Sequence, residues 1–167
     1  MTVAEQPEVR RRPAFAFGPG HLLAIAGGIA VIVSIFLNWE DLTVAGHHST
    51  AKARDVPVKF LFDYTTRSKD PSFVLLLAII AAVILVGVLL GGRLVGGRFL
   101  VLIGALLAIA VAVVFSFQVH QALNALHVAK AISVTDFVGP APYVAFAGGV
   151  LALIGSFIRT PVDRAAV

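Results

Sequence analysis

Four long stretches of the chain contain no Asp, Glu, Lys or Arg. They lie between Arg12 and Glu40, between Asp70 and Arg93, between Arg98 and Lys130, and between Asp136 and Arg159. A helix needs about 20 apolar residues to cross the roughly 30 Å hydrocarbon layer of a bilayer, so each stretch is long enough to contain a membrane span. We predict four spans, at residues 21–38, 72–91, 99–119 and 142–158.

The composition indicates that much of this chain faces lipid. Of its 167 residues, 59% are hydrophobic and 13% are charged, whereas a soluble domain has about 45–50% apolar and about 25% charged residues. Backbone groups cannot stay unpaired in lipid, and the uniformly apolar runs lack the alternation of barrel strands. The predicted fold class is therefore an all-α membrane protein, a bundle of four transmembrane helices. A soluble enzyme, a nucleic-acid-binding domain and a disordered chain are excluded.

Residues near the ends of the spans are typical of helix starts and of a membrane surface. Asp70 followed by Pro71 fits an N-cap and first helical position, where the missing N–H of proline costs nothing. Pro140 has the same place before the fourth span. We expect the rings of Trp39 and Tyr143 to act as interfacial anchors, because the headgroup level favours amphipathic aromatic side chains.

The arginines predict the orientation. With the N-terminus inside, seven basic and three acidic residues fall in the cytoplasmic segments, a net charge of +4, whereas six basic and six acidic residues fall outside. Residues 10–12 and the short hairpin near residue 95 lie directly beside spans, where the positive-inside rule acts most strongly. We predict a multi-pass plasma-membrane protein with both termini in the cytoplasm. Arg93 and Arg98 are expected to contact lipid headgroups.

The first span has a second interpretation as a cleaved signal peptide. Residues 10–12 are basic, an apolar run follows, and residues 43–45 loosely resemble a cleavage site. The apolar run from His21 to Leu37 is, however, longer than the usual signal-peptide core of about 7–15 residues. We therefore predict that the first span is retained.

The segments outside the spans are two outer loops at residues 39–71 and 120–141, an inner hairpin at 92–98, and tails at 1–20 and 159–167. In the first outer loop, apolar residues alternate with others from Val56 to Tyr64, the period of a strand with one buried face. We expect this strand to pair with residues 41–44 across a turn at residues 46–50. The result is a small β-hairpin over the outer ends of the helices, with Pro57 restricting its strand to a sheet edge.

The third helix is expected to continue past the membrane to about Ala131, because apolar residues recur there at helical spacing beside a polar stripe. His120 and His127 lie two turns apart on one face of this extension, and His47 or His48 in the facing loop could complete a zinc or copper site. The alternative is that these polar residues only occupy the wet end of an amphipathic helix. We take that alternative and predict no metal and no cofactor.

No other pattern in the chain indicates catalysis or transport. It has no cysteine, no paired carboxylates and no phosphate-loop sequence. No ionisable Asp, Glu, Lys or Arg lies within a span, where a proton- or ion-coupled carrier normally keeps one. We therefore expect a protein that is not an enzyme and has no catalytic residues.

Small residues recur at four-residue spacing in every span, for example Ala24 and Gly28 in the first and Gly104 and Ala108 in the third. Such faces let helix backbones approach closely, which is how helices associate in lipid. We expect them to pack the four helices against each other. A face left over could bind a membrane-protein partner or a second copy of the chain.

Short motifs at the span ends resemble those of a group of small four-span membrane proteins of actinobacteria. These motifs are Phe36-Leu37-Asn38-Trp39, Asp70-Pro71-Ser72 and Val138-Gly139-Pro140-Ala141-Pro142-Tyr143. Many members end the first span with Leu-Pro-Trp, where this chain has Asn38 in place of proline. The layout is also similar to that of claudin-like tetraspans, although their Gly-Leu-Trp motif and paired cysteines are absent. The first resemblance implies four spans and carries no settled activity.

The sequence therefore favours a structural or accessory subunit of a cell-envelope or transport complex, held in the lipid bilayer and binding no nucleic acid. The expected docking surfaces are the first outer loop and a small-residue helix face. Two alternatives stay open. One is an oligomeric component that transports small solutes or lipids, and the other is a membrane protein that binds metal at its outer face.

Overall fold

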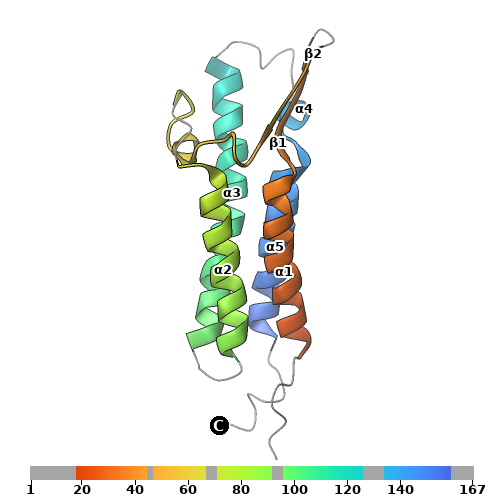
Figure 1. Ribbon diagram of the computed structural model, residues 1–167, viewed down its shortest axis with the longest axis vertical. Coiled ribbons are helices and arrows are strands. Elements are labelled where there is room, and N and C mark those ends of the chain that lie inside the picture. Colours follow the sequence, from red (N-terminus) through yellow and green to blue (C-terminus); the bar gives the residue numbers. More distant parts are fainter. Residues whose placement is uncertain (1–17, 45–46, 67–70, 92–95, 126–133, 159–167) are drawn as a thin grey trace, which may run out of the picture.

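Four long helices form an elongated bundle with a β-hairpin at one end (Figure 1). The computed structural model describes residues 18–44, 47–66, 71–91, 96–125 and 134–158. The long helices are α1 (Pro19–Phe36), α2 (Phe73–Gly91), α3 (Gly96–Ala125) and α5 (Pro140–Phe157). The shorter elements are strands β1 (Asn38–Val44) and β2 (His47–Lys52), the 3₁₀ turn η1 (Val58–Leu61) and the one-turn helix α4 (Val134–Phe137). We call the hairpin end of the bundle the capped end.

All four predicted spans are helices, and each is long and apolar enough to cross a membrane. The predicted fold class, a four-helix transmembrane bundle with a small hairpin, is confirmed. Helix α3 has 30 residues and is therefore about 45 Å long at 1.5 Å per residue, more than the hydrocarbon layer needs. The predicted end of this helix near Ala131 lies outside the described residues.

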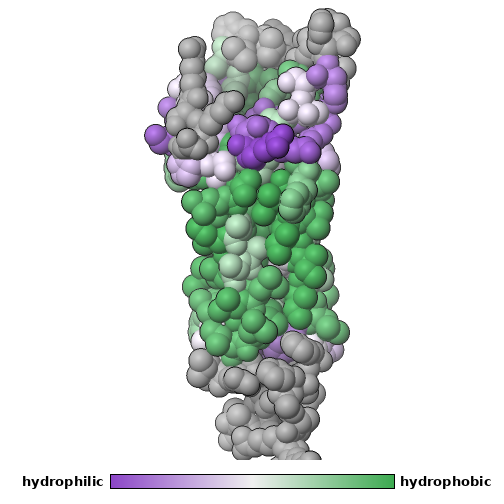
Figure 2. Space-filling model, in the orientation of Figure 1, coloured by the Kyte–Doolittle hydropathy of each residue, from purple (hydrophilic) through white to green (hydrophobic). Residues whose placement is uncertain are grey.

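An apolar belt covers the face of the bundle that Figure 2 shows, below the hairpin. Exposed side chains from all four long helices contribute to it, among them Ile29 at 51%, Ile79 at 52%, Ile103 at 50% and Ile154 at 47% exposure. A water-soluble protein rarely exposes such a large apolar surface, whereas lipid contacts it at no cost. Polar side chains are concentrated at the capped end, above the belt (Figure 2).

Glycines allow the helices to approach within backbone contact. A Cβ atom on Gly27 would lie 2.4 Å from the carbonyl oxygen of Gly148, and one on Gly20 would lie 2.7 Å from that of Gly155, so α1 and α5 pack without intervening side chains. Gly87 likewise lies against α3, where its Cβ would be 2.8 Å from the Gly97 carbonyl oxygen. The small-residue faces therefore hold the bundle together internally.

The hairpin forms, but with different strands from those expected. Strand β1 pairs with β2 in antiparallel register, from Asn38 opposite Lys52 to Val44 opposite His47. The prediction of a strand over residues 56–64 is wrong, because the chain turns there into η1 and a further turn. Pro57 has no N–H to donate, and Val58 N–H instead donates to the Pro71 carbonyl at 2.7 Å, so this segment is held by the start of α2. Within this segment Val56 and Leu61 are buried and Val58 and Phe60 are partly buried against the core, whereas Phe62 is exposed, so burial does not follow the alternation.

Candidate functional site

A buried aromatic cluster joins the capped end to the bundle. The Trp39 ring of β1 meets Phe73 of α2 edge-on, with ring centroids 5.1 Å apart, and Phe115 of α3 at the same distance. Phe60 of η1 lies 5.5 Å from Phe115. The two edge-to-face pairs of Trp39 stabilise by about 0.5–1.5 kcal/mol each beyond the burial of their area. Four segments that are far apart in the sequence are thereby fixed to one another.

Trp39 occupies the centre of this cluster and not the membrane surface. Its side chain is fully buried, and its indole N–H donates to the carbonyl oxygen of Ser34 at 3.0 Å, in the last turn of α1. The ring that we expected to contact headgroups is therefore enclosed by protein. The other expected anchor, Tyr143, is 55% exposed at the start of α5 and stays a predicted lipid contact.

A second link runs from the middle of the capped end to α3. The Gln118 side chain donates an N–H to the carbonyl oxygen of Leu61 at 2.9 Å, and both residues are buried. Buried polar groups are costly unless they are hydrogen-bonded, so this bond fixes the position of η1 on α3. The sequence showed Gln118 only as a polar residue near a span end, and its bond to a backbone oxygen 57 residues away had no local signal.

Strand β1 is also held from its other side. Gly139 N–H donates to the Trp39 carbonyl at 3.0 Å, and Glu40 forms an isolated antiparallel bridge with Val138. No Cβ fits at Gly139, because it would lie 2.2 Å from the Asn38 carbonyl oxygen. Packing at this point partly buries Glu40, and the burial raises the pKa of its carboxyl group above the ordinary value of 4.5.

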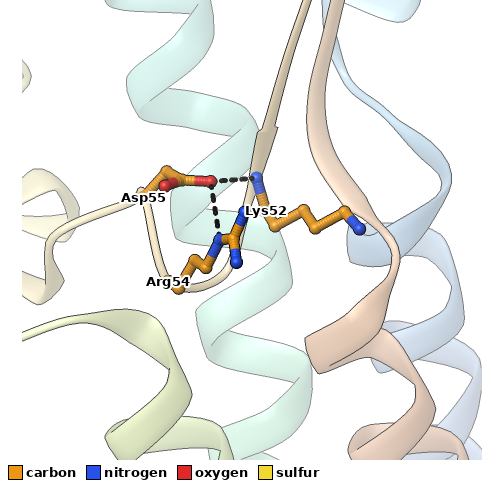
Figure 3. Close-up of polar contacts among 3 residues, drawn as sticks. All are labelled: Lys52, Arg54 and Asp55. Carbon is orange, nitrogen blue, oxygen red and sulfur yellow. Dashed lines mark hydrogen bonds and ion pairs between the residues drawn. The ribbon is translucent and has the colours of Figure 1, made fainter.

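A turn after β2 leads the chain from the hairpin back to the aromatic cluster. One carboxylate oxygen of Asp55 accepts the Lys52 backbone N–H at 3.2 Å and lies 3.6 Å from Nε of Arg54, as Figure 3 shows. The Arg54–Asp55 ion pair is exposed and contributes little to stability. The turn itself contributes more to stability, because it buries Ala53 and Val56 against the bundle.

The hypothesised metal ligands are not brought together in the part of the chain that the structure describes. His48 lies on the hairpin with Nδ1 3.4 Å from an Asp41 carboxylate oxygen, and His120 shares a hydrogen bond of 3.1 Å with Asn124 on α3. No group of three His, Cys, Asp or Glu side chains converges among the described residues. His127 lies outside the described residues, as does the side chain of His47.

The opposite end of the bundle contains a pocket between the four long helices. Its enclosed volume of about 20 Å³ admits about one water molecule, and its polar lining residues are His21 from α1, Arg98 from α3 and Ser156 from α5. The Nδ1 atom of His21 is buried, and its Nε2 atom lies 3.6 Å from the place of a Cβ on Gly91. Arg98, expected at the headgroups, thus also faces a cavity, while Arg93 lies outside the described residues.

The fold and these two regions define a class: a four-helix membrane protein with a β-hairpin fixed over one end and a small pocket between the helices at the other. Comparisons of the chain with protein-family models, with curated proteins and with solved structures gave no match.

Proposed function

We propose that this chain is a non-catalytic accessory subunit of a larger membrane complex of the cell envelope, and that the hairpin at its capped end docks a partner protein. In this proposal the chain is a multi-pass protein of the plasma membrane, with both termini in the cytoplasm and the capped end outside. The excess of arginine beside the spans supports that orientation.

The observation that carries the proposal is the firm attachment of the capped end to the bundle. Ordering a backbone residue costs about 1–2 kcal/mol, so a loop with no role beyond joining two spans gains nothing from a fixed structure. Here the aromatic cluster around Trp39 and the Gln118 bond hold residues 38–44 and 47–61 in one arrangement. A fixed surface above the membrane is what a docking partner requires.

The exposed surface of the capped end offers both polar and apolar contacts. His48, Ser49 and Thr50 of β2 are exposed, and Phe62 has 84% of its surface exposed after η1. Aromatic side chains of this kind frequently dominate the binding energy of protein interfaces. The small-residue faces of the helices are used inside the bundle, which makes the capped end the preferred docking surface.

Site-specific photo-crosslinking in native membranes tests the proposal. A photoreactive amino acid is placed at Thr50 or at Phe62 in the capped end, and at Ile79 in the apolar belt as a control. We expect the two cap positions to capture the same protein partner, and the Ile79 position to capture only lipid. Recovery of monomer alone, or only of a second copy of this chain, from both cap positions would contradict the proposal.

A further inference from the structure

The hairpin at the capped end has one covered edge and one open edge. Strand β1 pairs with β2 on one side. On the other side of β1, Glu40 forms an isolated bridge with Val138. The N–H of Gly139 bonds to the Trp39 carbonyl on this same side. Among the described ranges of the chain, β2 has β1 as its only neighbouring strand, so the outer edge of the sheet is β2.

The pairing of the two strands determines which backbone groups of β2 point to this open edge. The Trp39 carbonyl points to Gly139 and away from β2, and the backbone groups of Asp41, two residues later, point the same way. Asp41 lies opposite Thr50. In an antiparallel pair of strands, opposite residues either bond to each other or both point away. The N–H and C=O groups of Thr50 therefore point to the open edge.

The turn after β2 indicates the same direction independently. The Lys52 N–H donates to the Asp55 carboxylate at 3.2 Å, as Figure 3 shows, and the Lys52 carbonyl accepts the Asp55 N–H at 2.8 Å. These backbone groups of Lys52 are thus used away from β1, and those of Thr50, two residues earlier, have the same direction. Thr50 is exposed, and no other group among the described residues bonds to its N–H or C=O.

This edge lacks the features that commonly keep an open sheet edge from pairing. Native sheets protect such edges with proline, bulges or lysines along the edge strand. Strand β2 contains no proline, and the irregularity in the pairing lies on β1, between Asn38 and Glu40. Its single lysine, Lys52, is at the end where the turn begins. The backbone groups at Thr50 are thus accessible to a further strand.

We propose that the partner of the capped end supplies an extended segment that pairs with β2 as a third strand. Its backbone accepts a hydrogen bond from the Thr50 N–H and donates one to the Thr50 carbonyl. A hairpin of two strands is only marginally stable, and a third strand adds backbone hydrogen bonds to it. This inference rests on the proposed function and adds the kind of segment that docks.

The two faces of β2 indicate the side chains of that segment. Ala51 is partly buried against the core, whereas Thr50 and Lys52 are exposed on the opposite face. We expect the docking segment to alternate in the same way, with small or apolar side chains toward the bundle and polar ones away from it. A second copy of the chain would offer its own β2, in which Ala51 is the only apolar residue of six. The expected occupant is therefore a different protein.

Two variants of Thr50 separate backbone pairing from side-chain contact. Thr50→Pro removes the N–H at the open edge and places a ring there, but leaves the pairing with β1 intact. Thr50→Val keeps the N–H and the branched shape and removes only the hydroxyl. A photoreactive amino acid at Phe62 reports partner capture in native membranes. We expect Thr50→Pro to lower this capture about tenfold, the effect of losing a backbone hydrogen bond, and Thr50→Val to leave it unchanged.

A proline at the preceding residue checks the direction of the backbone groups. The Ser49 N–H points to β1, so Ser49→Pro should break the hairpin and lower the melting temperature in detergent. Thr50→Pro should keep the melting temperature of the wild type. An equal decrease in both variants would mean that the Thr50 N–H bonds within the hairpin, which overturns the proposal.

Disulfide crosslinking determines the conformation of the docking segment. The chain has no cysteine of its own, so Thr50→Cys introduces a single thiol. Single cysteines are then placed along the segment of the partner that the Phe62 probe captures. Crosslinking at every second position is expected for a strand, whereas a helix gives every third or fourth position. A helical period, or no period, overturns strand pairing.

The outcomes separate this inference from the proposed function. If the Phe62 probe captures no partner in the otherwise unchanged chain, the proposed function fails, and this inference fails with it. If Thr50→Pro is captured as well as the wild type, docking stands and strand pairing is overturned. An equal loss in Thr50→Val and Thr50→Pro assigns recognition to the hydroxyl group and also overturns it. A disulfide only between two copies of Thr50→Cys overturns a different protein as the occupant.

Discussion

Trp39 shows how one side chain can connect two parts of a membrane protein. The residue lies three positions after the end of α1, and its ring contacts α2 and α3 while its N–H bonds back to α1. The sequence places a tryptophan at the end of a span, which is typical of an interfacial anchor. Full burial gives it a different role, because its removal would leave a cavity between the hairpin and three helices.

Replacing this ring is expected to loosen the capped end. Trp39→Ala should lower the free energy of unfolding by about 3–5 kcal/mol, the usual cost of deleting a large buried aromatic side chain. Trp39→Phe should cost less, since it keeps an aromatic ring and loses the bond to the Ser34 carbonyl. Thermal unfolding in detergent measures both effects, with Tyr143→Ala at an exposed site as the control. Equal melting temperatures for Trp39→Ala and the control would refute this role.

The burial of Glu40 predicts how the stability of the fold depends on pH. Burial raises its folded-state pKa, so below the ordinary value of 4.5 the carboxyl group is neutral in both the folded and unfolded chain, and the folded state keeps its full stability. As the pH rises from that value through the raised pKa, the unfolded chain ionises more readily, and stability falls.

The variant Glu40→Gln removes this titration. We expect its melting temperature to exceed that of the wild type at pH 7 by more than it does at pH 4. Exposed Asp136, on α4, provides a matched control in Asp136→Asn. A Glu40→Gln difference that is the same at both pH values would show that burial of the carboxylate has no part in it.

Among the elements, the close packing of α1 against α5 depends on glycine. Each helix has glycines where the backbone of the other helix lies closest, with Gly20 against Gly155 and Gly27 against Gly148. Close approach gains dispersion contacts that larger side chains would prevent, and these contacts replace the hydrophobic driving force that lipid removes. A four-residue spacing of small residues predicts such a face without saying which helix it meets.

A single methyl group at this contact should separate the two helices. Gly27→Ala places a Cβ 2.4 Å from a backbone oxygen of α5, which cannot rotate away, and overpacking of this kind costs about 1–3 kcal/mol. Gly96→Ala is the control, because no atom lies within 4 Å of its Cβ and alanine favours the helix. Unfolding in detergent should show a loss of stability for the first variant and none for the second. A loss of the same size in both would contradict the packing argument.

The hairpin shows that an alternating apolar pattern does not identify which segment pairs with β1. Alternating apolar residues from Val56 to Tyr64 have the period of a strand, yet the polar segment His47–Lys52 forms the second strand instead. That segment follows β1 after only two residues, and a short connection favours pairing of neighbouring strands. The apolar segment is instead held at the ends of α2 and α3, by the Val58 bond to the Pro71 carbonyl and by the contact of Phe60 with Phe115.

At the level of the whole molecule, the polar and apolar surfaces are arranged along one axis. The apolar belt lies next to the capped end (Figures 1 and 2). The pocket lined by His21 and Arg98 is at the opposite end of the bundle. Both α1 and α5 have one end beside this pocket, since Gly20 lies against Gly155 there. The two termini of the described bundle are therefore on the same side of the belt.

The absence of cysteine from the sequence makes the orientation directly measurable. Single cysteines at Thr50 in β2 and at Gly96 at the start of α3 are both on exposed positions. In intact cells, a membrane-impermeant maleimide should label Thr50→Cys at once and Gly96→Cys only after permeabilisation. The opposite pattern would reverse the orientation proposed above.

The sequence by itself determined the four helices, because exclusion of charge from lipid is a large free-energy term that acts on each residue separately. It also indicated that small residues pack the bundle. The tertiary structure alone decided the strand partner of β1, the burial of Trp39, the bond from Gln118 to Leu61 and the meeting of His21 with Arg98 in one pocket. Each of these depends on residues far apart in the chain, whose contacts follow from the packing of whole helices and not from any local pattern.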